Sequence, residues 1–169
     1  MMENLLIINP AGITDEVAKT YRSREAARGV VFDQDGKVAV LPVSNHNFYK
    51  LHGGGIEAGE EKIEAFRREC LEEIGSDIEV LSELGYIIEY RSEFSIIQTS
   101  YCYTSRVIGE RKEAAFTESE ISQGFQQPMW IPLDEALRLV STSTPNNYEG
   151  GFIKERDTFI LEIVKKSKK

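Results

Sequence analysis

Apolar and polar residues follow two periods along the chain, and together they predict strands followed by helices. Runs rich in β-branched and aromatic residues, bounded by turn residues, are typical of strands. These runs cover residues 5–8, 26–32, 38–43, 48–51, 78–90, 94–108 and 129–131. The sequence Asp-Gln-Asp-Gly at 33–36 is typical of a hairpin turn. Residues 91–93 separate the two longest runs, which we expect to form an antiparallel pair.

Helical spacing marks three other segments. Over about 60–74, apolar side chains recur on one face at about 100° per residue, at Ile63, Phe66, Cys70 and Ile74. Gly75 follows, where helices commonly end. Pro132 and Asp134 open a second helix to about residue 140. Spacing of the same kind resumes from Ile153, and the basic residues 165–169 suit a helix C-terminus.

Strands with few interposed helices predict a mixed α+β fold. The 169 residues suffice for one domain with a real core and are too few for two. We expect an N-terminal extension over 1–23, a core over 24–157, and a C-terminal helix with a basic tail over 158–169. The polar stretch 109–127 predicts a loop over a site, and 141–151 is rich in turn residues.

The helix predicted at 60–74 carries Glu69, Glu72 and Glu73 close together on the side opposite its apolar face. Like charges at this spacing repel each other. Divalent cations among them would remove the repulsion, because hard cations take oxygen ligands. Upstream, the glycines at 53–55 let backbone approach a ligand closely.

Residues 54–76 read as the pattern G-x5-E-x7-R-E-U-x-E-E-x-G-U, in which U is aliphatic. This pattern resembles the Nudix box, the signature of the Nudix hydrolases. Cys70 stands at an aliphatic position as a small hydrophobe. Ser76 departs from the last aliphatic position, and His52 stands where many relatives carry proline. A looser resemblance extends from about residue 24 to about 157.

The resemblance implies a Nudix-type α/β/α sandwich and a metal-dependent pyrophosphohydrolase. Its substrate would be a nucleoside diphosphate linked to another moiety. By analogy, Glu69, Glu72 and Glu73 would bind Mg²⁺ or Mn²⁺, and a backbone carbonyl of Gly53 or Gly54 would complete the shell. Arg68, paired with Glu60, would orient the carboxylates.

The chemistry of phosphoanhydride hydrolysis fits these roles. It needs neutralised phosphate charge and an activated water, and a magnesium ion serves both needs. One glutamate would act as general base, and the sequence does not single it out. The alternative function is a Nudix-fold sensor that binds a nucleotide metabolite without turnover.

Net charge narrows the range of partners. The chain has 20 basic and 28 acidic residues, for a net charge of −8. Such acidity suits a small phosphorylated substrate better than a nucleic acid polymer. The apolar run at 5–8 is too short to cross a membrane and lacks a basic region before it. The chain has two cysteines, too few for a disulfide framework, which suggests a reducing, cytoplasmic setting. By analogy with the family, we also consider a homodimer formed through residues 1–23.

Some residues have two interpretations. Glu120, with Thr117, fits a capping box, which we favour over a role as base or metal ligand. His52 is expected to shape the turn rather than contact phosphate. Cys70 is expected to pack in the core. The same holds for three aromatic residues that could otherwise stack on a base, Phe48, Tyr49 and Trp130.

Overall fold

The computed structural model describes residues 1–168. Its longer elements agree with the periods in the sequence. The strands are β1 (Asn4–Ile8), β2 (Arg22–Phe32), β3 (Val38–Val43), β4 (Phe48–Lys50), β5 (His52–Gly55), β6 (Asp77–Arg91), β7 (Ile96–Ile108) and β8 (Met129–Ile131). The helices are α1 (Asp15–Ala18), α2 (Lys62–Ile74), α3 (Glu118–Ser122), α4 (Leu133–Ser141) and α5 (Tyr148–Ser167).

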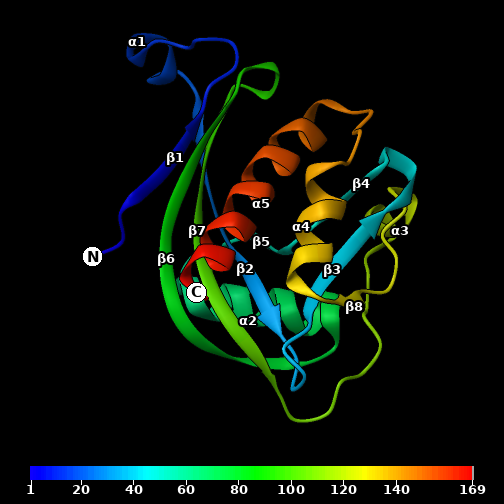
Figure 1. Ribbon diagram of the computed structural model, residues 1–169. Helices are drawn as coiled ribbons and strands as arrows, with labels where there is room; N and C mark the ends of the chain where they lie inside the picture. Colours follow the sequence, from blue (N-terminus) through cyan, green and yellow to red (C-terminus); the bar gives the residue numbers. More distant parts are fainter. Residues whose placement is uncertain (169) are drawn as a thin grey trace.

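The sheet is mixed, and its centre is the long antiparallel pair β6–β7 (Figure 1). β7 runs parallel to β2, and β2 pairs antiparallel with the glycine-rich β5. β1 adds a parallel edge beside β6. β3 continues the sheet after the hairpin turn and pairs antiparallel with β4 and β8. The expected antiparallel pair and the hairpin are therefore both present.

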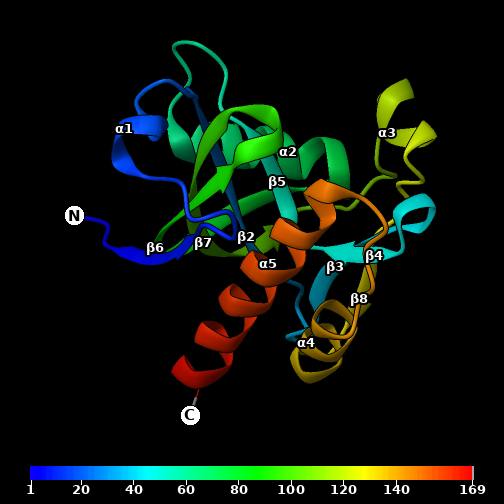
Figure 2. The same cartoon turned by 90° about the horizontal axis from the view of Figure 1, so that it is seen from above.

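Helices cover both faces of this sheet (Figures 1 and 2). α2 packs on β2, β5 and β6, and its buried face includes Phe66, which stacks on Tyr103 of β7. α4 and α5 pack on the opposite face, where Val30, Ile87 and Ile160 belong to one core cluster. The predicted α+β fold with flanking helices is confirmed.

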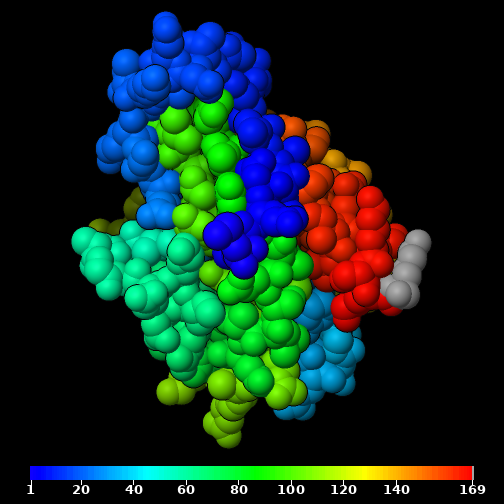
Figure 3. All heavy atoms as spheres, turned by 90° about the vertical axis from the view of Figure 1, so that its left-hand side faces the viewer, coloured from blue at the N-terminus to red at the C-terminus, as the bar shows by residue number. Residues whose placement is uncertain are grey.

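The N-terminal segment belongs to the sheet. β1 lies along β6 and next to α5, as the blue atoms show across the green strands in Figure 3. One edge of β1 is thus paired with β6, and β1 forms the end of the sheet. Among residues 1–168, no helix is long and apolar enough to cross a membrane.

Three expectations for local structure need correction. α5 begins at Tyr148, before the predicted start, because the Asn147 side chain accepts a hydrogen bond from Gly150 N–H (2.8 Å) and caps the helix. Ile63 is 38% exposed and lies outside the core, whereas Ala65 is buried in its place. The stretch 109–127 contains a helix, α3.

Candidate active site

The helix α2, which carries the three glutamates, has defined cap residues at both ends. Its N-cap is Glu61, and its C-cap Gly75 adopts a left-handed conformation with φ 74°. A Cβ at Gly75 would lie 1.9 Å from the carbonyl oxygen of Lys112. Glycine is therefore required there both for its backbone angle and for the close passage of the following loop.

Arg68 ties α2 to the loop before it. Its guanidinium donates from Nε to Glu60 Oε2 (2.8 Å), from Nη2 to the carbonyl of Gly55 (3.0 Å) and from Nη1 to Glu69 Oε1 (3.0 Å). The hydrogen bond from Arg68 lowers the pKa of Glu60 to about 2. Helix, loop and strand β5 therefore meet at a single side chain.

Glu73 is buried beneath the glycine-rich strand. Its Oε1 accepts from Gly53 N–H (3.0 Å), and its Oε2 lies 3.6 Å from Lys50 Nζ. His52, also buried, places Nδ1 3.4 Å from the same carboxylate. Burial alone would raise the pKa of Glu73, but Lys50, His52 and Gly53 N–H bring it down to about 2. Glu73 is thus an anion held in place from three sides.

Glu69 and Glu72 occupy different surroundings. Glu69 is largely buried, and burial together with the charge of Glu73 raises its pKa. A Cβ at Gly54 would lie 2.4 Å from Glu69 Oε1, so a side chain there would displace the Glu69 carboxylate. The Glu72 side chain is 46% exposed, with Oε1 3.6 Å from Arg68 Nη1.

A cavity of about 260 Å³ opens between the glycine strand, α2 and α5. The predicted residues that line it are Gly53, Gly54, Glu69, Glu73 and Glu120. Glu72 lies outside it. Within residues 1–168, no three His, Cys, Asp or Glu side chains are gathered closely enough to hold a metal ion in this arrangement. Glu73 is turned to Lys50 and Gly53, while Glu69 and Glu72 are turned to Arg68.

The oxygen donors nevertheless suit a hard divalent cation. Two carboxylates share one cavity, and burial together with the charge of Glu73 raises the pKa of Glu69. A cation beside the two carboxylates would favour their ionised forms. Glu72 sits one helical position from Glu73 with an exposed side chain that is free to turn.

The structure also shows the surroundings of the residues for which the sequence allowed two roles. Thr117 and Glu120 form the predicted capping box, and Glu120 lines the cavity as well. His52 has no exposed surface, which agrees with a role in shaping the strand. Phe48 and Cys70 are buried in the core, and Tyr49 and Trp130 pack against it.

The cavity is also lined by five basic residues that were not expected from the sequence. They are Arg24 and Arg28 on β2, Lys50 on β4, Arg91 on β6 and Arg156 on α5. Behind them the buried Glu89 accepts from Arg91 Nη2 (2.8 Å) and Arg156 Nη1 (3.2 Å). The sequence offered one sign of these residues, a charged residue within an apolar run, such as Arg28 in 26–32. The pattern alone does not show whether such a residue lines a cavity or an ion pair.

The buried ion pairs around Glu89 make the free energy of unfolding depend on pH. Arg156, Arg91 and Arg28 outweigh the effect of burial and lower the pKa of Glu89 from an ordinary 4.5 to about 2. Because the folded value is the lower one, the stabilisation is complete above about pH 4.5 and is lost as the pH falls towards 2. We expect the free energy of unfolding to decrease over this window in urea titrations. A Glu89→Gln variant should show a flatter pH dependence, and an identical slope would contradict the assignment.

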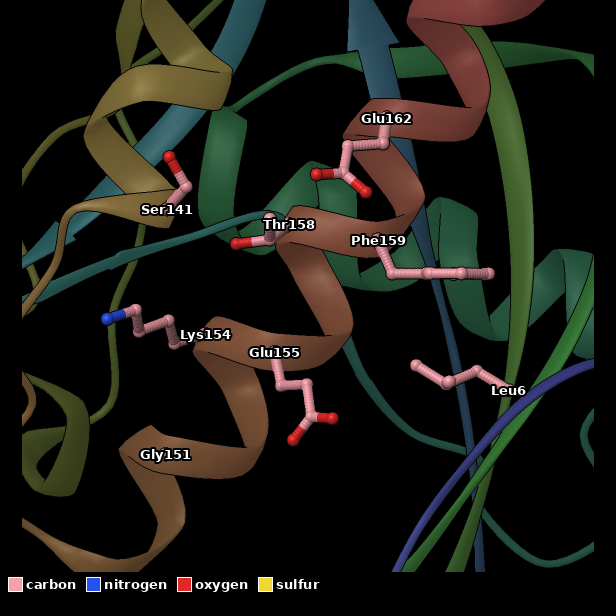
Figure 4. Close-up of a pocket in the computed structure, with 8 residues that line it drawn as sticks. All are labelled: Leu6, Ser141, Gly151, Lys154, Glu155, Thr158, Phe159 and Glu162. Carbon is pink, nitrogen blue, oxygen red and sulfur yellow. The ribbon is translucent and has the colours of Figure 1, made fainter.

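A larger cavity, of about 480 Å³, lies elsewhere on α5 (Figure 4). Leu6 of β1 and Ser141 of α4 border it, together with side chains of α5. Lys154 and Glu155 point in different directions, so the polar groups do not converge. The smaller cavity, with its facing carboxylates and guanidinium groups, is therefore the candidate active site.

In this fold a carboxylate-bearing helix is held against a glycine strand beside the cavity. The NUDIX domain family model matches residues 22–149. The chain therefore belongs to the NUDIX family, and the prediction of a Nudix hydrolase is confirmed. A sequence search of curated proteins finds no significant match.

Solved structures share the fold at low sequence identity. An ADP-ribose pyrophosphatase from Streptococcus suis 89-1591 is 17% identical, with a TM-score of 0.53, over 83% of this chain and 91% of its own. A UDP-X diphosphatase is 18% identical, with a TM-score of 0.57, over 95% of this chain and 68% of its own. A MutT protein from Methanosarcina mazei Go1 is 18% identical, with a TM-score of 0.55, over 84% and 96%. These similarities concern the fold.

Proposed function

We propose that this protein hydrolyses a pyrophosphate bond in a nucleoside diphosphate linked to another moiety, with Mg²⁺ or Mn²⁺ as cofactor. The products are a nucleoside monophosphate and a second phosphorylated product or pyrophosphate. The observation that carries the proposal is the shared cavity of Glu69 and Glu73 beneath the glycine strand. The names of the similar pyrophosphatase and diphosphatase structures support the same reaction class.

Glu69, Glu72 and Glu73 would hold the metal, with a carbonyl of Gly53 or Gly54 beside them. A bound divalent ion supplies neutralisation of phosphate charge and a more acidic water. Arg68 binds both Glu60 in the loop and Glu69 on the helix, and it therefore fixes the position of the Glu69 carboxylate. Lys50 holds Glu73 ionised and therefore ready to act as a ligand.

A carboxylate of the cavity accepts the proton of the attacking water. Glu69 is one candidate for this step, because its carboxylate lines the cavity. Glu120 is the second candidate, since it reaches the cavity from α3. Its Oε1 already accepts from Thr117 N–H (2.9 Å), so a role as base would compete with the capping box.

The reducing, cytoplasmic setting expected from the sequence agrees with two buried, unpaired cysteines, Cys70 and Cys102.

The proposal is tested with a panel of nucleoside diphosphate derivatives, incubated with magnesium, with manganese and with a chelator. We expect release of a nucleoside monophosphate from at least one compound, and its loss in the chelator. Binding without product across the panel would instead support the sensor. A complete lack of effect on melting temperature by every compound would contradict both functions.

A further inference from the structure

A cluster of guanidinium groups lines the same cavity as the metal-ligand candidates. It comprises Arg24, Arg28, Arg91 and Arg156, contributed by β2, β6 and α5. Arg28, Arg91 and Arg156 are each at most 4% exposed. Charged side chains are rarely buried this deeply unless they are paired, so their partners decide what the cluster is for.

Carboxylates compensate most of this charge. Glu89 accepts from Arg91 and Arg156, as described above, and Asp157 accepts from Arg156 Nε (2.8 Å). At the rim, Glu149 accepts from Arg91 Nη1 (2.9 Å). Arg24 is exposed and donates to Gln98. The three buried guanidinium groups thus share two buried carboxylates and Glu149 at the rim, and Arg28 forms no ion pair among residues 1–168.

The buried donors that lack a carboxylate partner belong to Arg28 and Arg156. Arg156 is 1% exposed, and its Nη2 has no hydrogen-bond partner among residues 1–168. In the same part of the chain, the one hydrogen bond found for the Arg28 guanidinium runs from Nε to Ser100 Oγ (3.1 Å). Burial and the neighbouring charge of Arg156 lower the pKa of Arg28 to about 10. Both side chains therefore line the cavity with guanidinium nitrogens that have no carboxylate partner among residues 1–168.

A purely structural role explains the cluster less well. An ion-pair network that only stabilised the fold would have equal numbers of charges and no orphan donor, because a buried unsatisfied donor is costly. Here Arg28 has no ion-pair partner and Arg156 keeps an orphan donor among residues 1–168, and both side chains border open volume. Forked guanidinium groups at such a position are suited to the tetrahedral oxygens of phosphate.

We propose that Arg28 and Arg156 form a subsite for a phosphate group of the substrate beyond the scissile diphosphate. This inference rests on the proposed function, since it assigns the scissile diphosphate to the carboxylate end of the cavity. The arginine end then receives the next phosphate of the same molecule. The enzyme consequently prefers substrates with a third phosphate over those whose remaining moiety is a neutral sugar.

Direct binding tests the subsite without any turnover. Melting temperature is measured with inorganic phosphate in a chelator, against chloride at equal ionic strength. Phosphate at about ten times its Kd should raise the melting temperature of the wild type by about 3 °C. Arg28→Gln should lose this shift. Arg106→Gln, which removes an exposed arginine paired with Glu79, is the matched control and should keep it.

The outcomes are decisive in each arm. An absent phosphate shift in the wild type overturns the subsite whether or not any variant folds. An undiminished shift in Arg28→Gln overturns the assignment of that residue. Arg28→Lys provides a second variant, because it keeps the charge but not the forked geometry, and we expect it to lose most of the shift.

Kinetics then tests the role in specificity. A nucleoside triphosphate and a nucleoside diphosphate sugar of the same base are compared by their ratio of kcat/KM. Arg28→Gln should lower this ratio by at least about tenfold, whereas Arg106→Gln should leave it unchanged. An equal loss on both substrates overturns the role in specificity. If neither compound is hydrolysed, the proposed function is at fault, and the phosphate shift still decides the subsite.

Discussion

Replacing Glu73 by glutamine is expected to reduce kcat at least tenfold, which corresponds to about 1.4 kcal/mol of barrier. The amide keeps the shape of the side chain but removes the charge that would bind the metal. It also leaves Lys50, whose side chain is 9% exposed, without its counter-ion. Loss of one partner of a buried pair costs about 3 kcal/mol, so urea denaturation should show reduced stability as well.

Glu72→Gln separates the two effects. Its side chain is about half exposed, so we expect the same fall in kcat with a change in stability below about 0.5 kcal/mol. Glu64→Gln is the matched control, because Glu64 lies on the same helix and its side chain is 60% exposed, facing Arg67. Wild-type kcat in both Glu72→Gln and Glu73→Gln would refute the proposed metal ligands.

Replacing Glu89 by glutamine is expected to destabilise the fold by about 3–5 kcal/mol at neutral pH. The change leaves Arg28, Arg91 and Arg156 buried with Asp157 as their remaining buried carboxylate. The measurement is the free energy of unfolding in urea, under conditions in which the variant is still folded without denaturant.

A matched change at the surface sets the scale. Glu79 pairs with Arg106 at 2.7 Å, but its side chain is 49% exposed. Glu79→Gln should therefore cost less than about 1 kcal/mol. Similar losses in Glu79→Gln and Glu89→Gln would mean that burial of the arginine cluster does not govern stability.

The parts of the site encoded in a short stretch of sequence could be predicted. Apart from Ile63, the apolar stripe of α2 and its terminal glycine lie within one helix, where spacing alone fixes the relative directions. The three glutamates lie on that helix too, but among residues 1–168 they do not gather, since Glu72 lies outside the cavity. The longest strands were also predictable, because β6 and β7 are long runs with a short connection. Both predictions depend on local periodicity.

The arginine wall could not be predicted in this way. Arg28 contacts Ser100, and Arg156 contacts Glu89, across large separations in sequence. Strand pairing brings these residues together, and a single sequence does not specify the register of the pairs. The start of α5 at Tyr148 could not be predicted for a different reason. Two glycines, Gly150 and Gly151, are poor helix formers, and the cap at Asn147 overrides their preference.

The position of β1 has a consequence for how the chain is assembled during synthesis. Asn4 pairs with Tyr86 and Ile8 with Glu89, so β1 leaves the ribosome well before its partner strand exists. It must wait unpaired while β2 through β5 emerge, and contacts this distant in sequence form slowly. The nascent protein therefore completes one edge of its sheet with a segment made much earlier than its partner strand.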